Sequence, residues 1–308
     1  MPHVFGPVPS RRLGRSLGLD LVPFKTCPFD CVYCQLGPTT NKTLERADYV
    51  PIEPVLSELR SRLATTRPDT ITLSGSGEPT LHRRAGELIR RIQALTDVPV
   101  AVLTNAALLA EPDVRAELAG ADLVVPSLDA ADAETLQRVN RPAAGVEFDR
   151  LVAGLEAFGR AAAGEVRLEI MLVAGVNDGD AHVRRLAACV RRIGPGRVQL
   201  NTVTRPPTEA DARPVAPRRL AEIAAAFDPP AEVIAPFEVR GVGGDWSAGL
   251  DDVAALLARR PCTLDDVAAA LGMHRNEAVK YLEHLTADGA VEKAPVADRV
   301  YYRPADRR

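Results

Sequence analysis

The sequence predicts an α/β protein with a mostly parallel sheet, followed by a small C-terminal domain. Apolar, β-rich runs alternate with amphipathic helical patterns over about the first 235 residues. Strands that alternate with helices form βαβ units and a parallel sheet, and six such units fit a partial barrel. Past residue 230 the pattern changes to a proline- and glycine-rich stretch and then to three helical segments, which predicts the second domain.

The six predicted strands are apolar and rich in β-branched residues. They cover residues 17–23, 70–74, 98–104, 121–127, 166–173 and 198–203, with one further short strand at 231–235. Helical patterns lie between them, for example from Pro54 and from Ala85, where apolar residues recur at i, i+3 and i+4. In parallel barrels the functional site gathers where the strands end at their carboxyl side. The residues that follow each strand are therefore the candidates for function.

Three of the five cysteines, Cys27, Cys31 and Cys34, lie within eight residues at the spacing C-x3-C-x2-C. A disulfide is disfavoured because the chain has no secretory signal and its thiols are expected to stay reduced. A structural zinc site usually needs four paired ligands, and the next cysteine is Cys189. A [4Fe–4S] cluster usually takes four thiolates, so three would leave one iron open to a substrate or cofactor. Cys189 and Cys262 lie in helical segments and suit small buried positions.

The cysteine loop follows the first predicted strand and carries Tyr33 before its last cysteine, and it resembles the signature of the radical S-adenosylmethionine (SAM) enzymes. The resemblance implies a partial (β/α)6 TIM-like barrel, a [4Fe–4S] cluster held by Cys27, Cys31 and Cys34, and SAM as the second cofactor. It also implies reductive cleavage of SAM to a 5′-deoxyadenosyl radical, which abstracts hydrogen from the substrate. The electron would come from a low-potential donor of the flavodoxin or ferredoxin type.

The loops after the later strands complete the site that this resemblance implies. The stretch "SGSGEPT" is similar to the family's GGEP motif, with a serine in place of the usual glycine, and is expected to hold the amino group of SAM. Asn105, Ser127 and Asp129 would contact the methionine carboxylate and the ribose hydroxyls, although Ala106 replaces a more usual glycine. Glu169 is a carboxylate in an apolar strand, so it must be paired or functional if it is buried. The expected cofactor-binding residues are Tyr33, Gly75, Ser76, Gly77, Glu78, Pro79, Asn105, Ser127, Asp129 and Glu169; Met171, Asn177 and Asn201 are expected beside them.

Longer strings, among them "GRSLGLDLVPFKTCPFDCVYCQLG", "NRP" at 140–142 and "LNTVTRPP", point to a narrower branch. Together they resemble bacterial and archaeal radical proteins that are grouped with the tRNA wyosine-base synthases, over residues 10–230. The wyosine reaction is not implied, because the chain lacks a second set of cysteines. Lys25 and Lys42 flank the cysteine loop, and we interpret them as exposed loop lysines rather than reactive amines.

The C-terminal segment resembles a winged helix-turn-helix domain, with a recognition helix that begins near His274 and carries Arg275, Asn276 and Lys280. We expect the barrel at 1–235, a linker at 236–247 and this domain at 248–308. From Asp245 onward the chain has eleven acidic and nine basic residues, whereas nucleic-acid-binding modules are usually basic. Docking of a nucleic acid and docking of a protein or peptide are therefore equally open roles.

Two functions are consistent with these features. The first is a radical SAM enzyme that acts on an RNA base, a peptide or protein, or a small metabolite. The second is a non-catalytic iron–sulfur regulator with a DNA-binding winged helix; a regulator would not need the "SGSGEPT" loop or a full barrel. The chain of 308 residues has a net charge of −3 and no apolar run as long as a membrane span, so we expect a cytoplasmic protein with no membrane partner.

Overall fold

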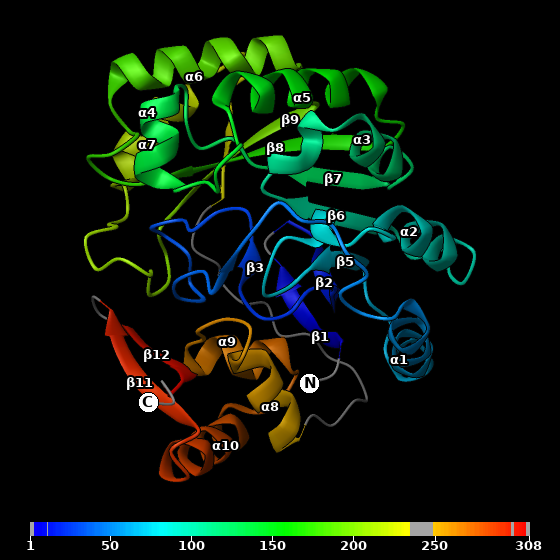
Figure 1. Ribbon diagram of the computed structural model, residues 1–308. Helices are drawn as coiled ribbons and strands as arrows, with labels where there is room; N and C mark the ends of the chain where they lie inside the picture. The colour runs from blue at the N-terminus through cyan, green and yellow to red at the C-terminus, as the bar shows by residue number, and fades with distance from the viewer. Residues whose placement is uncertain (1–2, 11, 235–248, 297–298, 306–308) are drawn as a thin grey trace.

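The computed structural model describes residues 3–10, 12–234, 249–296 and 299–305, and its main feature is an eight-stranded sheet (Figure 1). The strands lie in the order β1-β2-β5-β6-β7-β8-β9-β10. Neighbours from β2 to β10 pair in parallel, whereas β1 pairs antiparallel with β2. The bounds are β1 Val4–Ser10, β2 Gly14–Asp20, β5 Thr70–Ser74, β6 Val100–Thr104, β7 Leu123–Pro126, β8 Glu165–Leu172, β9 Arg197–Thr202 and β10 Glu232–Val233.

The six predicted strands correspond to β2 and β5 to β9, and the parallel α/β architecture is confirmed. The first of them begins and ends three residues earlier than predicted, at Gly14 and Asp20. The sequence did not predict β1, whose two prolines are poor strand signals. Proline is tolerated on edge strands, where it removes no hydrogen bond from the ladder, and β1 lies at the end of the sheet. Two further strands of two residues each, β3 Thr26–Cys27 and β4 Asn41–Lys42, pair within the cysteine loop.

Helices cover the outer face of the sheet (Figure 1). They are α1 Ile52–Thr65, α2 Ala85–Gln93, α3 Pro112–Leu118, α4 Ala133–Val139, α5 Phe148–Ala161, α6 Asp180–Ile193 and α7 Pro217–Ala224, with 3-10 turns at Pro79–Leu81 and Ala107–Ala110. In α1 the buried residues Ile52, Val55, Leu56 and Leu59 form one stripe at helical spacing. Each such aliphatic side chain contributes about 1.5–3 kcal/mol on burial. None of the helices in the described ranges is long and apolar enough to cross a membrane.

Strand β8 shows how the sheet divides its side chains between the core and the barrel interior. Val166, Leu168, Ile170 and Leu172 are buried, and the residues between them are only partly buried. Because side chains alternate across a strand, Glu169 and Met171 point to the opposite face, toward the interior. The apolar half of the strand therefore anchors it against the helices and leaves its polar half for the site.

The C-terminal module, residues 249–296 and 299–305, has a core of its own. It consists of α8 Leu250–Leu257, α9 Leu264–Ala270, α10 Arg275–Ala287 and the antiparallel pair β11 Val291–Val296 and β12 Arg299–Pro304. This is the predicted order of three helices and a strand pair; the identification as a winged helix stays a prediction, and the predicted linker at 236–247 lies outside the described residues. Val8 of β1 packs against the core of the module, and the Tyr301 hydroxyl donates to the Thr204 carbonyl at 2.7 Å. The module is therefore docked against the barrel.

Candidate functional site

A cavity of about 340 Å³ lies at the carboxyl ends of the strands, a size typical of small-molecule sites. We call it the cysteine cavity. Its wall combines the cysteine loop, the loop after β5, and the ends of β8 and β9. It includes Arg12, Lys25, Cys27, Tyr33, Cys34, Gln35, Gly75, Ser76, Gly77, Glu169, Met171, Asn201, Thr202 and Arg205.

The sulfur of each cysteine in the loop accepts a hydrogen bond from the side-chain nitrogen of another residue. Asn105 Nδ2 lies 3.4 Å from Cys27 Sγ, and Asn140 Nδ2 lies 3.4 Å from Cys31 Sγ. These donors favour the thiolate form. Burial acts against it, because it raises the pKa of Cys27 to about 12 and that of Cys31 well above the ordinary value. Burial therefore favours the neutral thiols at these positions, and a bound metal cation would favour the thiolates.

Lys25 is buried, with 3% of its surface exposed, which corrects the interpretation of an exposed loop lysine. Its Nζ lies 3.0 Å from Cys34 Sγ. Its backbone has a φ of 58°, an uncommon value for a residue with a side chain. The neighbouring chain holds it there, since Lys25 N donates to the Ser76 carbonyl at 2.8 Å and Asn41 N donates to the Lys25 carbonyl at 3.1 Å.

The glycine-rich loop after β5 packs directly on the cysteine loop. A Cβ on Gly77 would lie 2.2 Å from the Thr26 carbonyl oxygen, and the backbone N–H of Glu78 donates to that oxygen at 3.0 Å. Gly75 has a φ of +123°, a conformation that side chains rarely allow. Ser76, the departure from the GGEP pattern, donates through Oγ to Asp20 at 2.6 Å. The glycines are thus required by contacts within the protein as well as by access to the cavity.

Glu78 lies behind the cavity wall and joins the ends of β5 and β6. Its buried carboxylate accepts hydrogen bonds from Thr80 N at 3.1 Å, Thr104 Oγ1 at 2.7 Å and Asn105 N at 2.7 Å. Burial raises the pKa of Glu78, and these hydrogen bonds partly oppose the shift. Both oxygens are engaged within the protein, so the observed role of Glu78 is to fix the two loops.

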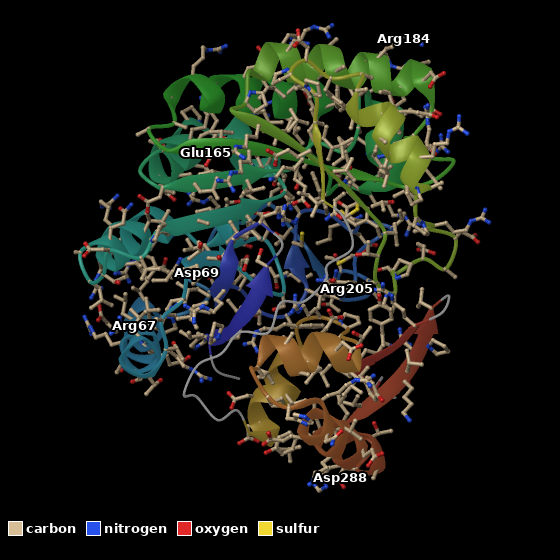
Figure 2. All side chains as sticks on the ribbon, turned by 180° about the vertical axis from the view of Figure 1, so that it is seen from behind. Arg67, Asp69, Glu165, Arg184, Arg205 and Asp288 are labelled. Carbon is tan, nitrogen blue, oxygen red and sulfur yellow. The ribbon has the colours of Figure 1, made fainter. Side chains whose placement is uncertain are left out.

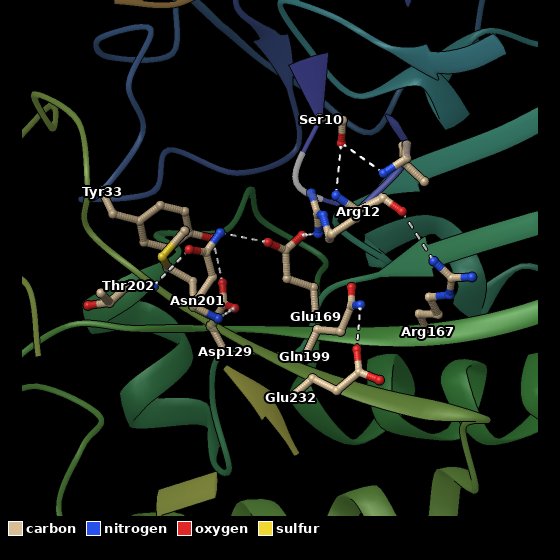
Figure 3. A network of polar contacts seen from close by, with 12 residues as sticks. Ser10, Arg12, Tyr33, Asp129, Arg167, Glu169, Gln199, Asn201, Thr202 and Glu232 are labelled. Atoms are coloured by element: carbon tan, nitrogen blue, oxygen red, sulfur yellow. Dashed lines mark hydrogen bonds and ion pairs between the residues drawn. The ribbon is translucent and has the colours of Figure 1, made fainter. Parts of the chain in front are cut away.

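Asp129 orients Tyr33 at the cavity wall (Figure 3). The Tyr33 hydroxyl donates to Asp129 Oδ2 at 2.5 Å, Asn140 Nδ2 donates to the same oxygen at 2.7 Å, and Met171 N donates to Oδ1 at 2.8 Å. Burial raises the pKa of Asp129 to about 6, although these donors act in the opposite direction. Asn177 completes the network by donating to the Asp129 carbonyl at 2.8 Å. Asp129 therefore acts on the cavity through Tyr33.

Glu169 enters the cavity as a paired carboxylate, as its place in an apolar strand requires. It forms an ion pair with Arg12, and Asn201 Nδ2 donates to its Oε1 at 3.1 Å (Figure 3). Arg12 lies between β1 and β2, and no motif marks it in the sequence. It meets Glu169 only because β1 and β2 lie across the barrel opening from β8.

The predicted site residues thus fall into two groups. Cys27, Cys34, Tyr33, Gly75, Ser76, Gly77 and Glu169 line the cavity. Cys31, Glu78, Pro79, Asn105, Ser127 and Asp129 are not part of its wall, and most of them hold wall residues in place. The cofactor-binding roles assigned to both groups stay predictions.

Comparison with known proteins identifies the family. A model described as the Radical SAM superfamily matches residues 21–187. The chain belongs to the radical SAM superfamily. Enzymes of this class use a [4Fe–4S] cluster and SAM as cofactors, and they generally receive their electron from a donor such as flavodoxin or ferredoxin.

Relatives of this radical SAM enzyme cover nearly its whole length. It is 30% identical to the UPF0026 protein of Methanocaldococcus jannaschii over 98% of this chain and 96% of that protein. It is 34% identical over 94% of its length to a Brachyspira hyodysenteriae protein named GTPase Obg, of which it spans 43%. The structure resembles that of a radical SAM methyltransferase from Sphaerobacter thermophilus, with a TM-score of 0.52 and 21% identity over 71% of this chain and 66% of that one. The last similarity shows the shared fold.

The side chains around the three sulfurs fit an iron–sulfur cluster. Hydrogen bonds to cluster sulfurs tune such centres, and Asn105, Asn140 and Lys25 provide donors of this kind. The described residues contain no group of three His, Cys, Asp or Glu side chains that could hold a single metal ion. A [4Fe–4S] cluster does not need such a group, because each thiolate binds a different iron atom of the cluster.

Sequence reasoning missed the partners that position the site. Asn140 contacts the network of Cys31, Tyr33 and Asp129, and Arg205 reaches Gln35 on the cysteine loop at 3.2 Å. Both residues lie in strings that marked the narrower branch, "NRP" and "LNTVTRPP", so the resemblance located them without giving their roles.

Proposed function

We propose that Cys27, Cys31 and Cys34 bind three irons of a [4Fe–4S] cluster and that SAM occupies the cysteine cavity. The observation that carries the proposal is the set of three thiols, each with an N–H donor. Two of them, Cys27 and Cys34, line a cavity whose wall also includes the glycine-rich loop. When bound and reduced, the cluster supplies the electron that cleaves SAM to a 5′-deoxyadenosyl radical. Hydrogen abstraction from the substrate follows from that chemistry.

The chain's own residues orient the cofactor and shield it. Gly75 and Gly77 keep the wall free of side chains where the methionine end would approach the fourth iron. Tyr33 is fixed by Asp129 and offers its ring to the cavity. Glu169 and Asn201 provide the polar side, where a carboxylate can accept hydrogen bonds from ribose hydroxyls.

An RNA base, a peptide and a small metabolite are all compatible with hydrogen abstraction as the substrate. We propose that the C-terminal module helps to position the substrate. The module supports this because it is packed against the barrel beside the cavity. Membership of the radical SAM superfamily favours the enzyme over the non-catalytic regulator with a DNA-binding winged helix.

The test is formation of 5′-deoxyadenosine by reconstituted, reduced protein given SAM. We expect slow formation without substrate, and loss of both iron and product in Cys27→Ala, Cys31→Ala and Cys34→Ala. Cys189→Ala is the matched control, since Cys189 is buried in α6 away from the loop. A fully loaded wild-type protein that formed no 5′-deoxyadenosine would contradict the proposal.

A further inference from the structure

A second cavity, of about 240 Å³, adjoins the cysteine cavity and shares Arg12, Gln35, Gly75 and Arg205 with it. We call it the arginine cavity. One side is formed by residues of the barrel, among them Ser16 and Thr72. The other side is formed by the C-terminal module, through Leu256, Arg259, Arg260 and Asp266. A molecule in this space would lie next to SAM and would touch both parts of the chain.

Among the described residues, four arginines line the arginine cavity, and two of them have identified counter-charges. Arg12 pairs with Glu169. Arg259 is buried, with its Nε 3.8 Å from Asp20 Oδ2 and its guanidinium 4.4 Å from the centre of the Phe5 ring. These contacts compensate both charges within the protein.

The other two arginines, Arg205 and Arg260, form no ion pair with any residue in the described parts of the chain. Arg205 donates to the neutral amide of Gln35 at 3.2 Å, and Arg260 Nε is buried without a hydrogen-bond partner. Among the described residues one carboxylate lies on the wall, that of Asp266. It accepts from Thr263 N at 3.0 Å in the cap of α9, and its charge partly opposes the lowering of the Arg205 pKa. Figure 2 shows Arg205 at the junction of the barrel and the module.

The two guanidiniums also act on each other. The pKa of Arg205 is lowered, first because of burial and second because of the positive charge of Arg260. Two partly desolvated like charges repel, and an anion between them would remove the repulsion. The surrounding segment is acidic overall, with eleven acidic and nine basic residues from Asp245 onward. The positive charge at the cavity is thus a local feature of the wall.

We infer that the arginine cavity binds a phosphomonoester group of the substrate, with Arg205 and Arg260 as its ligands. Guanidinium groups match phosphate oxygens in a two-pronged geometry. Arg205 and Arg260 have no ion-pair partner among the described residues, and a phosphomonoester, which carries a charge of about −1.5 to −2 near pH 7, can accept hydrogen bonds from both guanidiniums at once. A carboxylate or the phosphodiester of an RNA backbone carries one negative charge and would be held more weakly by the same two side chains. The assignment of this ligand as substrate rests on the proposed function, because it places the phosphorylated molecule beside SAM.

Calorimetric titration of the full-length protein with inorganic phosphate tests the site directly, with acetate as the carboxylate probe. We expect phosphate to bind and acetate to bind at least tenfold more weakly. Arg205→Gln and Arg260→Gln should each weaken phosphate binding at least tenfold, and Arg260→Lys, which keeps the charge without the fork, should give an intermediate loss. Arg218→Gln is the matched control, because the Arg218 side chain is 94% exposed and its ion-pair partner among the described residues is Glu222.

Thermal unfolding distinguishes a phosphate ligand from a merely structural residue. If Arg260 only stabilised the fold, its removal would lower the unfolding temperature. Without phosphate, Arg260→Gln should unfold at or above the wild-type temperature, since it removes a repelling charge. Phosphate should raise the unfolding temperature of the wild type and leave that of the variant unchanged. Phosphate binding that is the same in both glutamine variants as in the wild type would overturn the inference, and so would equal affinity for acetate.

Failure here and failure of the proposed function are distinguishable. Phosphate titration needs neither cluster nor SAM, whereas 5′-deoxyadenosine formation needs both and no phosphate. A wild-type protein that forms 5′-deoxyadenosine but does not bind phosphate would refute only the phosphate site.

Discussion

Replacement of Gly77 by alanine should displace the cysteine loop. The new Cβ would lie 2.2 Å from the Thr26 carbonyl oxygen and 2.5 Å from a methyl carbon of Val22, where ordinary contacts are about 3.5 Å or longer. The loop must therefore move by roughly 1 Å. Overpacking of this kind costs about 1–3 kcal/mol, and loss of the hydrogen bond from Glu78 N to Thr26 adds about 1 kcal/mol. Because Thr26 precedes Cys27, the displacement reaches a proposed cluster ligand.

Iron content and unfolding temperature of the reconstituted protein measure both effects. We expect Gly77→Ala to bind less than the full iron complement and to unfold several degrees below the wild type. Gly120→Ala is the matched control, since a Cβ there meets no atom within 4 Å and the backbone has no positive φ. It should keep its iron and unfold at or slightly above the wild-type temperature. Full iron loading and an unchanged unfolding temperature in Gly77→Ala would refute the packing of the two loops described above.

Three further predictions concern single side chains around the cavity. Lys25→Met should lower the reduction potential of the cluster by tens of millivolts, because it removes a positive charge and a hydrogen bond from Cys34; a redox titration followed by electron paramagnetic resonance would show no change if Lys25 were only a loop residue. Asp129 has a pKa raised to about 6 by burial, so between pH about 4 and about 6 the folded chain holds a proton that the unfolded chain has released. The free energy of unfolding falls by about 3 kcal/mol in all as the pH rises through this window, because the contribution of the neutral carboxyl is lost. Asp129→Asn removes this titration, so it should flatten the dependence of the apoprotein's unfolding temperature on pH between about 4 and about 6. A slope equal to that of the wild type would contradict the assignment. Asp132→Ala should lower the stability by about 0.5–2 kcal/mol, because the carboxylate of Asp132 caps α4 by accepting from Thr135 N at 2.8 Å; Asp132→Asn retains an acceptor and should lose less in the same thermal melt.

The cysteine loop and the six parallel strands could be predicted because their signals are local. An apolar run of five residues such as Thr70–Ser74 specifies a buried strand by its own composition, and the three cysteines lie so close in sequence that their spacing alone indicates a shared site. The carboxyl ends of parallel strands must share one edge, which placed Gly77 and Glu169 together without any knowledge of contacts. Strand β1 was missed because Pro7 and Pro9 contradict strand propensity, and only its position at the edge of the sheet explains them.

Other features depended on contacts between residues far apart in the chain. The sequence alone suggested that Glu78 faces the cofactor, but the structure engages both of its oxygens with Thr80, Thr104 and Asn105 behind the wall. Lys25 looked like an exposed loop lysine and is buried against Cys34, because the chain around it closes on the glycine-rich loop.

The sequence by itself determined that this chain builds a parallel α/β barrel, places three thiols at its carboxyl edge and carries a second small module. Each of these features is predicted by a pattern within a short stretch of residues. Only the tertiary structure decided that Arg205 and Arg260 line the same cavity, that Arg12 pairs with Glu169, and that the module forms a wall of the space beside the cysteine cavity. Charges separated by more than 50 residues leave no periodic pattern in the sequence. The contact between Arg12 and Glu169 depends on closure of the barrel, and the approach of Arg260 to Arg205 depends on docking of the module. The cysteine motif is thus local in the sequence, whereas the walls of both cavities are a property of the assembled fold.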